Sequence, residues 1–162
     1  MQRHSHWPLT IHWKRVLTVS AGVTLSLLLV GLLDDLTRHF LLVGSLGASS
    51  LLLFGFPDSA FSQPRNFLIG NFICALIGLA FVHLIGESWW TAAFATGIAV
   101  AVMMITDTLH PPAAANPLII FTLHSGWSFL LFPTLCGDSV VLAAALIYHR
   151  FTRKERYPHY WI

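Results

Sequence analysis

The sequence predicts an all-α membrane protein with four long transmembrane helices and two short or discontinuous ones. Of its 162 residues, 56% are hydrophobic and 10% are charged, and the mean hydropathy is +0.70. Soluble domains carry about 25% charged residues. The apolar residues also form long continuous runs instead of recurring at a helical or strand period. One polar, proline-rich stretch, residues 107–117, separates two of these runs. We expect a single transmembrane domain over residues 1–162.

Six apolar runs define the predicted elements. Long runs that predict membrane-crossing helices lie at residues 16–33, 67–85, 91–106 and 127–148. Shorter runs lie at residues 41–56 and 113–123. A short run cannot comfortably cross a hydrocarbon core of ~30 Å as a helix. The order long, short, long occurs twice, which divides the chain into a first half at residues 16–86 and a second half at residues 91–149.

Basic residues flank the apolar region at both ends. They are Arg3, Lys14 and Arg15 before the first run and Arg150, Arg153, Lys154 and Arg156 after the last. The positive-inside tendency therefore places both termini in the cytoplasm and requires an even number of crossings. We expect residues 1–15 to be an interfacial lead-in and residues 150–162 a cytoplasmic basic tail, in a bacterial inner membrane. Membrane lipid is the expected surrounding partner. Nucleic-acid binding is not expected, because the basic residues form no separate domain.

A shift of 67 residues places the two short runs on each other. Under this shift Ser49 coincides with Asn116, and Asn71 coincides with Asp138 in the last long run. Three segments per half would make the halves inverted in the membrane, as in many transporters. The sequence therefore predicts an inverted repeat whose short helices meet near the middle of the membrane.

The amino ends of the two short helices form the predicted anion site. Pro111 or Pro112 suits the first position of a helix, and we expect Ser45 to cap the other short helix. The unpaired N–H groups and the positive dipole end of a helix favour an anion without a buried lysine or arginine. The predicted substrate-binding residues are Ser45, Gly47, Ala48, Ser49, His110, Pro111, Pro112, Ala113 and Asn116.

Polar side chains within or beside the apolar runs are further candidates, because ionisable groups in membranes are usually functional. The candidates for a proton relay or pathway are His83, Asp107, Asp138 and Asn71, and those for an entrance are Arg65 and Asn66. Simpler roles stay open: Asp107 as a surface carboxylate, Asn71 as a packing residue, Arg65 as a charge anchor and His110 as an interfacial helix breaker. We expect Asp138 to face the bundle interior and to hydrogen-bond to Asn71 or His83.

Motifs of soluble enzymes are absent from the sequence. It has no glycine-rich phosphate loop, no nucleophile elbow and no cysteine or histidine pair with metal-ligand spacing. Cys74 and Cys136 both lie in apolar runs. We therefore predict no enzyme activity, no catalytic residue, no cofactor and no metal. A membrane enzyme that uses Asp138 with His83 is the weakest alternative.

Three ordered motifs resemble the HPP family of integral membrane proteins. Residues 109–113 (LHPPA) resemble its signature, residues 47–49 (GAS) and 63–66 (QPRN) its other two motifs, and residues 157–161 (YPHYW) its closing segment. The resemblance covers roughly residues 16–161. It implies a multi-helix transmembrane region. Because members in cyanobacteria and chloroplasts are linked to nitrite transport, it also implies nitrite as the first substrate to test.

The chain departs from the family pattern at two places. Residues 114–117 (AANP) stand where many members have Gly-Ala-Thr, and Asp107 stands where a basic or small residue is frequent. These differences mark the nitrite branch or alter the substrate. We expect transport of a small monovalent anion, with nitrite first and nitrate, formate or chloride as alternatives. A structural or sensory membrane subunit is the alternative from another class. A channel and a proton-coupled transporter both fit the sequence, as does a homo-oligomer.

Overall fold

The computed structural model describes residues 12–152 and 156–161, and over these residues all regular structure is helical. The elements are α1 (Trp13–Thr37), α2 (Gly44–Gly55), η1 (Ala60–Ser62), α3 (Pro64–Leu84), α4 (Trp89–Ile105), η2 (Pro111–Ala114), α5 (Ala115–Leu123), η3 (Leu130–Gly137) and α6 (Asp138–Thr152). The all-α prediction is confirmed. Residues 1–11 of the predicted lead-in and residues 153–155 and 162 of the predicted tail lie outside the described residues.

Three of the described helices are long and apolar enough to cross a membrane. They are α1 with 25 residues, α3 with 21 and the continuous segment Leu130–Thr152 with 23. The predicted fourth long helix, α4, has 17 residues. At 1.5 Å per residue it reaches about 25 Å, less than the ~30 Å of a hydrocarbon core. The prediction of four long helices is therefore not confirmed.

The first helix is longer than its apolar run. The prediction ended it near Asp34 and Asp35, but both residues lie inside α1, and the helix continues to Thr37. The left-handed residue that follows, Arg38 at φ 56°, ends the helix by donating its N–H to the Asp34 carbonyl oxygen. Polar side chains at a membrane surface do not stop a helix, so hydropathy alone placed the boundary too early.

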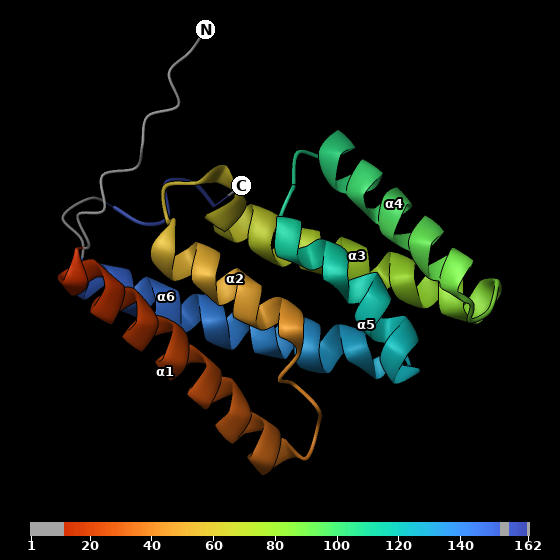
Figure 1. The fold of residues 1–162 in the computed structure, drawn as a ribbon, viewed down its shortest axis with the longest axis horizontal. Coiled ribbons are helices and arrows are strands. Elements are labelled where there is room, and N and C mark those ends of the chain that lie inside the picture. Colours follow the sequence, from red (N-terminus) through yellow and green to blue (C-terminus); the bar gives the residue numbers. More distant parts are fainter. Residues whose placement is uncertain (1–11, 153–155, 162) are drawn as a thin grey trace, which may run out of the picture.

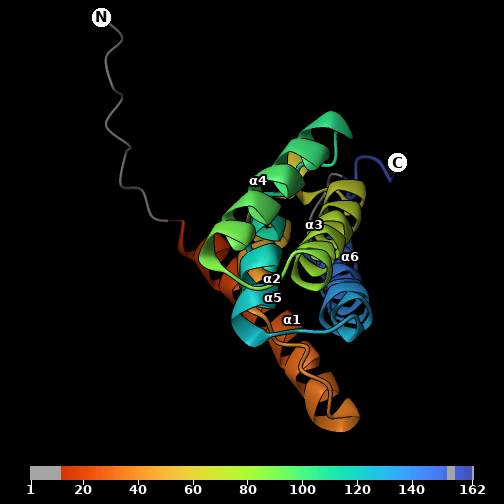
Figure 2. The same ribbon diagram turned by 90° about the vertical axis from the view of Figure 1, so that its right-hand side faces the viewer.

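The short helices α2 and α5 lie between the longer ones and run in opposite directions (Figure 1). In the turned view α3 and α6 form one layer, and α1, α2, α5 and α4 form the other (Figure 2). α1 contacts α2 and α6, while α4 contacts α5 and α3. The buried face of α2 consists of Ser45, Leu46, Ser49, Ser50, Leu53 and Phe54, which recur at helical spacing.

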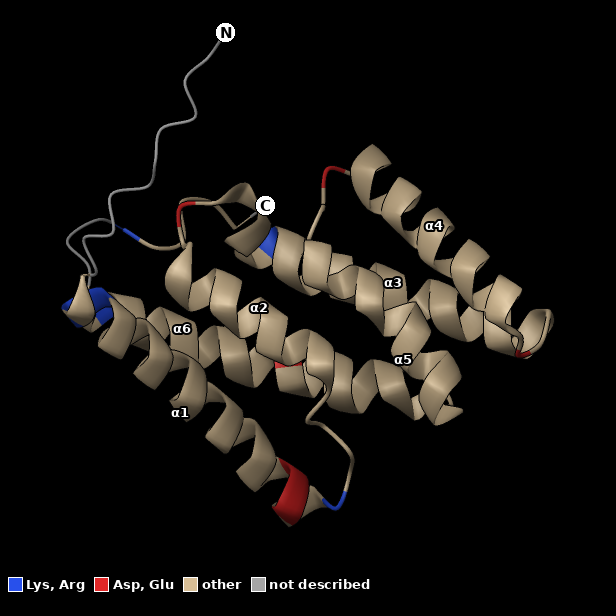
Figure 3. Ribbon diagram, in the orientation of Figure 1, with Lys and Arg blue, Asp and Glu red and all other residues tan. Residues whose placement is uncertain are grey.

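Charged residues gather at the two ends of the bundle (Figure 3). Lys14 and Arg15 open α1 at the end where α6 finishes, and Asp34, Asp35 and Arg38 lie at the opposite end of α1. Among the described Asp, Glu, Lys and Arg residues, Asp138 in α6 is the one that is buried. Large apolar side chains such as Leu28 and Leu36 are exposed along α1. This distribution fits a protein surrounded by lipid.

Glycines allow two close backbone contacts on α3. A Cβ atom at Gly70 would lie 2.7 Å from the Thr108 carbonyl oxygen, and one at Gly78 would lie 2.9 Å from Pro117 Cα. Both contacts join α3 to the segment that contains the central polar stretch. Small residues at helix contacts serve this purpose in membrane proteins.

We predict that Gly70→Ala lowers the thermal unfolding temperature of the purified protein in detergent, because the added methyl group meets backbone and not a flexible side chain. Overpacking of this kind costs about 1–3 kcal/mol. The matched control is Gly97→Ala in α4, where an added Cβ meets nothing within 4 Å. An unchanged unfolding temperature in Gly70→Ala would contradict the close contact.

Candidate functional site

The connection between α4 and η2 is held by the first turn of α3. The Arg65 guanidinium donates to the carbonyl oxygens of Thr106 at 3.0 Å and Asp107 at 3.1 Å. Asn66 Nδ2 donates to the Leu109 carbonyl oxygen at 3.1 Å. The last turn of a helix leaves carbonyl oxygens without partners inside the helix, and these side chains donate to carbonyl oxygens at and just after the end of α4. Arg65 and Asn66 therefore fix the connection, and their predicted role at an entrance stays a prediction.

Asp107 lies on the surface. Its side chain is 95% exposed, its carboxylate lies 3.6 Å from Arg65, and its backbone adopts the left-handed conformation at φ 53°. This position fits the simpler predicted role of Asp107, a carboxylate in a surface loop. It does not support the other predicted role, in a proton relay or pathway. Asp107 does not join the buried residues that follow it.

His110 is fully buried, and both of its ring nitrogens have protein partners. Nε2 lies 2.8 Å from Ser49 Oγ on α2, and Nδ1 lies 2.7 Å from the Phe61 carbonyl oxygen on η1. A carbonyl oxygen can only accept, so Nδ1 carries the hydrogen. In the neutral ring Nε2 then accepts, and the Ser49 hydroxyl donates to it. His110 thus joins the second half of the chain to the first.

Two buried amides form a second link between the halves. Asn116 Nδ2 on α5 donates to Asn71 Oδ1 on α3 at 2.9 Å, and Asn71 Nδ2 donates to the Phe67 carbonyl oxygen at 3.0 Å. The Asn116 side-chain oxygen is buried and has no hydrogen-bond partner among the described residues. Of the predicted residues, the structure therefore gathers Ser49, His110, Asn71 and Asn116 into one buried polar junction between α2, α3 and the segment Pro111–Leu123.

The second short segment offers fewer backbone donors than predicted. Pro111 occupies the first position of η2, as expected. Pro111 and Pro112 have no N–H, however, the N–H of Ala113 donates to the His110 carbonyl oxygen at 2.9 Å, and the N–H of Ala115 bonds within the turn. Two adjacent prolines preorganise the turn but remove the donors that an anion would use.

The start of α2 also differs from the prediction. The residue before the helix is Val43, without a side-chain cap, and Ser45 lies inside the helix, so the prediction that Ser45 caps α2 is wrong. Ser45 and Ser49 are buried, Gly47 is half-buried and Ala48 is exposed. The side chain of Ala48 therefore faces away from the polar junction, because helical residues one position apart point in different directions.

Asp138 is buried, as predicted, but it lacks its predicted partners. Its side chain is 2% exposed, and its Oδ2 atom has no hydrogen bond among the described residues. The predicted bond to Asn71 or His83 is wrong, because Asn71 pairs with Asn116 and His83 is exposed, stacked on Trp127 at 5.2 Å. The sequence analysis missed Thr134, one turn before Asp138, whose buried hydroxyl also has no partner in the described part of the chain.

The sequence analysis also missed the role of Gln63. Its Nε2 donates to the carbonyl oxygens of Pro57 and Ser59, and its Oε1 accepts from the backbone N–H of His159 at 2.9 Å. Tyr157 donates its hydroxyl to the Ser62 carbonyl oxygen at 2.7 Å. Burial raises the pKa of the Tyr157 phenol, which keeps this donor protonated. The closing segment of the chain is thus attached to the loop that positions Phe61.

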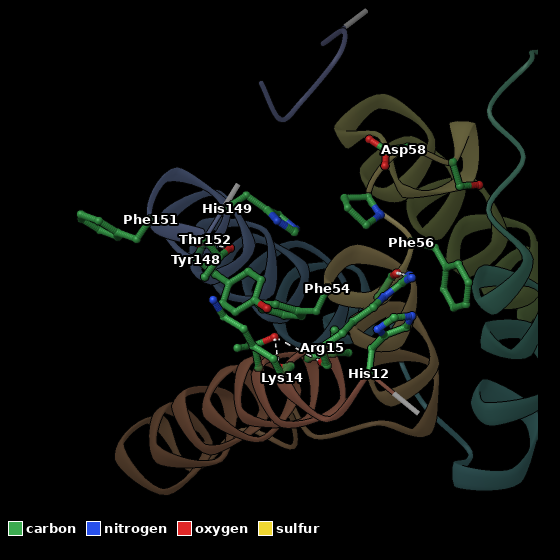
Figure 4. A pocket seen from close by; sticks show the side chains of 15 residues that line it. His12, Lys14, Arg15, Phe54, Phe56, Asp58, Tyr148, His149, Phe151 and Thr152 are labelled. Carbon is green, nitrogen blue, oxygen red and sulfur yellow. Dashed lines mark hydrogen bonds between the residues drawn. The ribbon is translucent and has the colours of Figure 1, made fainter. Parts of the chain in front are cut away.

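One cavity at the end of the bundle lies apart from the polar junction. It has a volume of about 820 Å³ and lies where α1 begins and where α2 and α6 end. His12, Lys14 and Arg15 line it together with aromatic side chains such as Phe54 and Phe56 (Figure 4). Arg15 donates to the Gly55 carbonyl oxygen at 2.8 Å. None of the predicted substrate-binding residues lines this cavity.

Comparisons with known proteins agree with the membrane assignment. The family described as "HPP, transmembrane region" matches residues 8–158. Two curated proteins of Dictyostelium discoideum, both named as transmembrane proteins, are 35% and 34% identical over 128 residues. Each alignment covers 74% of this chain and 45% or 41% of the relative, so the chain spans less than half the length of these relatives. No solved structure matches.

We predict that Asn116→Leu destabilises the protein by about 1 kcal/mol, because Asn71 then keeps a buried acceptor without its donor. The double variant Asn71→Leu/Asn116→Leu should lose less than the sum of the two single variants, since no amide is left unpaired. Unfolding in detergent measures all three. Strict additivity would show that the two amides do not interact.

Proposed function

Since this chain belongs to the HPP family of transmembrane proteins, we propose that it transports a small monovalent anion, with nitrite as the first candidate. The observation that carries the proposal is the buried polar junction formed by Ser49, His110, Asn71 and Asn116. Transporters place their binding sites at polar groups buried between the helices of their two halves. Because the chain spans less than half the length of its curated relatives, the activity of a full-length family member is also only proposed.

The proposal includes an inverted repeat, and two sets of contacts support it. Gly70 on α3 contacts the Thr108 carbonyl oxygen of the second half. Gly137 in η3 faces the Leu41 carbonyl oxygen of the first half, which would lie 3.7 Å from an ideal Cβ atom on Gly137. The members of both pairs are related by the same shift of 67 residues. The contacts between helices repeat in the same way. The short helix α2 of the first half packs on α6 of the second half, and the short helix α5 of the second half packs on α3 of the first half.

The chemistry of the polar junction favours an anion over a cation. Its side chains are an imidazole, a hydroxyl and two amides, which can present hydrogen atoms to a ligand without bringing a negative charge. The Ser49 hydroxyl donates to His110 in the present arrangement, and rotation about its C–O bond would turn that donor toward an anion. The amino end of α2 is not part of this set of donors, because Gly44 lines a groove with Thr122 and Leu123 at the far end of α5. Nitrite, with two oxygens and one charge, matches such a set of donors.

Orientation and assembly are further parts of the proposal. The bundle end that carries Lys14, Arg15 and Arg150 is assigned to the cytoplasm by the positive-inside tendency. Location in a bacterial inner membrane stays a prediction from sequence, since the matched relatives come from a eukaryote. A homo-oligomer also stays a prediction.

The experiment is anion uptake by liposomes that contain the purified protein. We expect nitrite flux above that of protein-free liposomes, and we expect His110→Ala to reduce it to that background because the Ser49 and Phe61 contacts are lost together. The matched control is His124→Ala, since His124 is exposed in the turn after α5, where it contacts Glu87. Parallel assays with nitrate, formate and chloride identify the preferred anion.

Two results would reject parts of this proposal. Wild-type liposomes that carry none of the four anions faster than the background would favour a structural or sensory subunit. Flux that persists unchanged in His110→Ala, with the variant folded, would move the pathway away from the polar junction.

A further inference from the structure

The point where η3 passes into α6 contains two buried oxygen atoms without partners. Asp138 is 2% exposed and Thr134 is 3% exposed, and neither Asp138 Oδ2 nor Thr134 Oγ1 has a hydrogen bond within the described residues. The segment Leu130–Gly137 is a π-helix with Pro133 in its interior. π-Helical turns are rare and recur at functional sites. Two unpaired oxygens one turn apart, at such a turn, are arranged to receive a ligand that brings positive charge or hydrogen.

The surroundings supply no counter-charge for an ionised Asp138. α2, which packs on α6, has no titratable side chain. The titratable or charged side chains of the other packed elements are Lys14, Arg15, Asp34 and Asp35 on α1, Arg65, Cys74 and His83 on α3, Cys136 in η3, and Tyr148, His149 and Arg150 on α6 itself. Within the described residues none of these forms a salt bridge or hydrogen bond with Asp138. A buried carboxylate without a partner costs several kcal/mol.

A proton satisfies this position better than a metal ion does. One proton needs one carboxylate oxygen, whereas metal cations that bind oxygen take about six ligands. The described residues contain no group of three or more His, Cys, Asp or Glu side chains that could hold a metal ion. The counterpart of Asp138 under the shift of 67 residues is Asn71, a neutral side chain of nearly the same shape. The fold therefore accommodates a neutral group at the related position.

The residue before Asp138 contacts α2, the helix that carries Ser49 of the polar junction. Gly137, its neighbour, faces the first turns of α2, where an ideal Cβ would lie 3.0 Å from Leu46 Cδ1. Leu46 and Ser49 lie three residues apart on the same buried face of α2. The segment that carries Asp138 therefore contacts α2 about one helical turn before Ser49.

We propose that Asp138 is the proton-binding residue that couples anion transport to a proton gradient, an inference that rests on the proposed function. An O–H bond forms on the carboxylate with a proton from water on one side of the membrane. The same bond breaks when the proton is released to water on the other side. No electrons are transferred, and one proton moving with one monovalent anion carries no net charge.

The test compares nitrite uptake with and without an imposed pH gradient, alkaline inside, after subtraction of uptake by protein-free liposomes. We expect the gradient to stimulate uptake by the wild type. Asp138→Asn should keep exchange of nitrite across the membrane without a gradient but lose the stimulation completely. The matched control is Asp35→Asn, an exposed acid in α1, which should respond to the gradient as the wild type does.

Stimulation of Asp138→Asn equal to that of the wild type would overturn this inference and leave the proposed function intact. Uptake that depends on Na⁺, and disappears when choline replaces it, would also overturn the assignment of a proton. No flux in any protein would reject the proposed function instead.

A second measurement tests Asp138 without transport and without a variant. Infrared spectroscopy of the wild type at neutral pH should show the C=O stretch of a protonated carboxylic acid. Among the acidic residues that the structure describes, Asp138 is the buried one, and it is therefore the candidate for this band. A spectrum without the band would overturn the inference even if Asp138→Asn failed to fold.

Discussion

Hydrocarbon offers no hydrogen bonds, and this constraint explains most of the polar contacts in the protein. The chain breaks its helical course between α4 and α5, and several described contacts around that break supply missing partners, although Asn66 Oδ1 and Asn116 Oδ1 have none among the described residues. Arg65 and Asn66 donate to freed carbonyl oxygens, and His110 bonds at both ring nitrogens. Most of these partners come from the first half of the chain. Residues of both halves therefore hold the break.

The family motifs, which are far apart in sequence, belong to one continuous set of contacts. Ser49 of the GAS motif meets His110 of the LHPPA motif. The QPRN motif holds the connection before LHPPA through Arg65, and it holds the closing segment through Gln63. Phe61, next to QPRN, supplies the carbonyl oxygen that orients the His110 ring. The motifs thus have a common structural purpose, which is to fix the geometry of the two short helices.

The sequence predicted the approximate positions of the elements and some of the buried polar residues, among them His110, Asn116 and Asp138. Apolar runs locate helices well, because burial in lipid requires them, and small polar residues within such runs must find partners. The partners themselves were not predictable. The pairing of Asn71 with Asn116, and not with Asp138, depends on how each helix is rotated about its axis. The buried, unpaired hydroxyl of Thr134 was not predictable, because a threonine in an apolar helix is common and usually donates to a backbone carbonyl oxygen of its own helix.

The ends of elements were the other part that the sequence could not predict. α1 continues through Asp34 and Asp35 because charged residues are compatible with a helix at the membrane surface. Ser45 resembles a capping residue, but Val43 precedes the helix instead. The two prolines of LHPPA were correctly expected to start a helix, yet their lack of N–H groups reduces the backbone donors at that end. A proline can thus favour the start of a helix and still provide no N–H group to a ligand.

The contact between Ser49 and His110 has a consequence for the biogenesis of the protein. The two residues are 61 positions apart, and α2, with 12 residues, reaches only about 18 Å. When the ribosome has released the first three helices, α2 has neither the length to span the bilayer nor its later neighbour. The Ser49 hydroxyl meets its histidine partner only after residue 110 has been synthesised. Until then the first half lacks part of its buried contacts, and the two halves complete these contacts together.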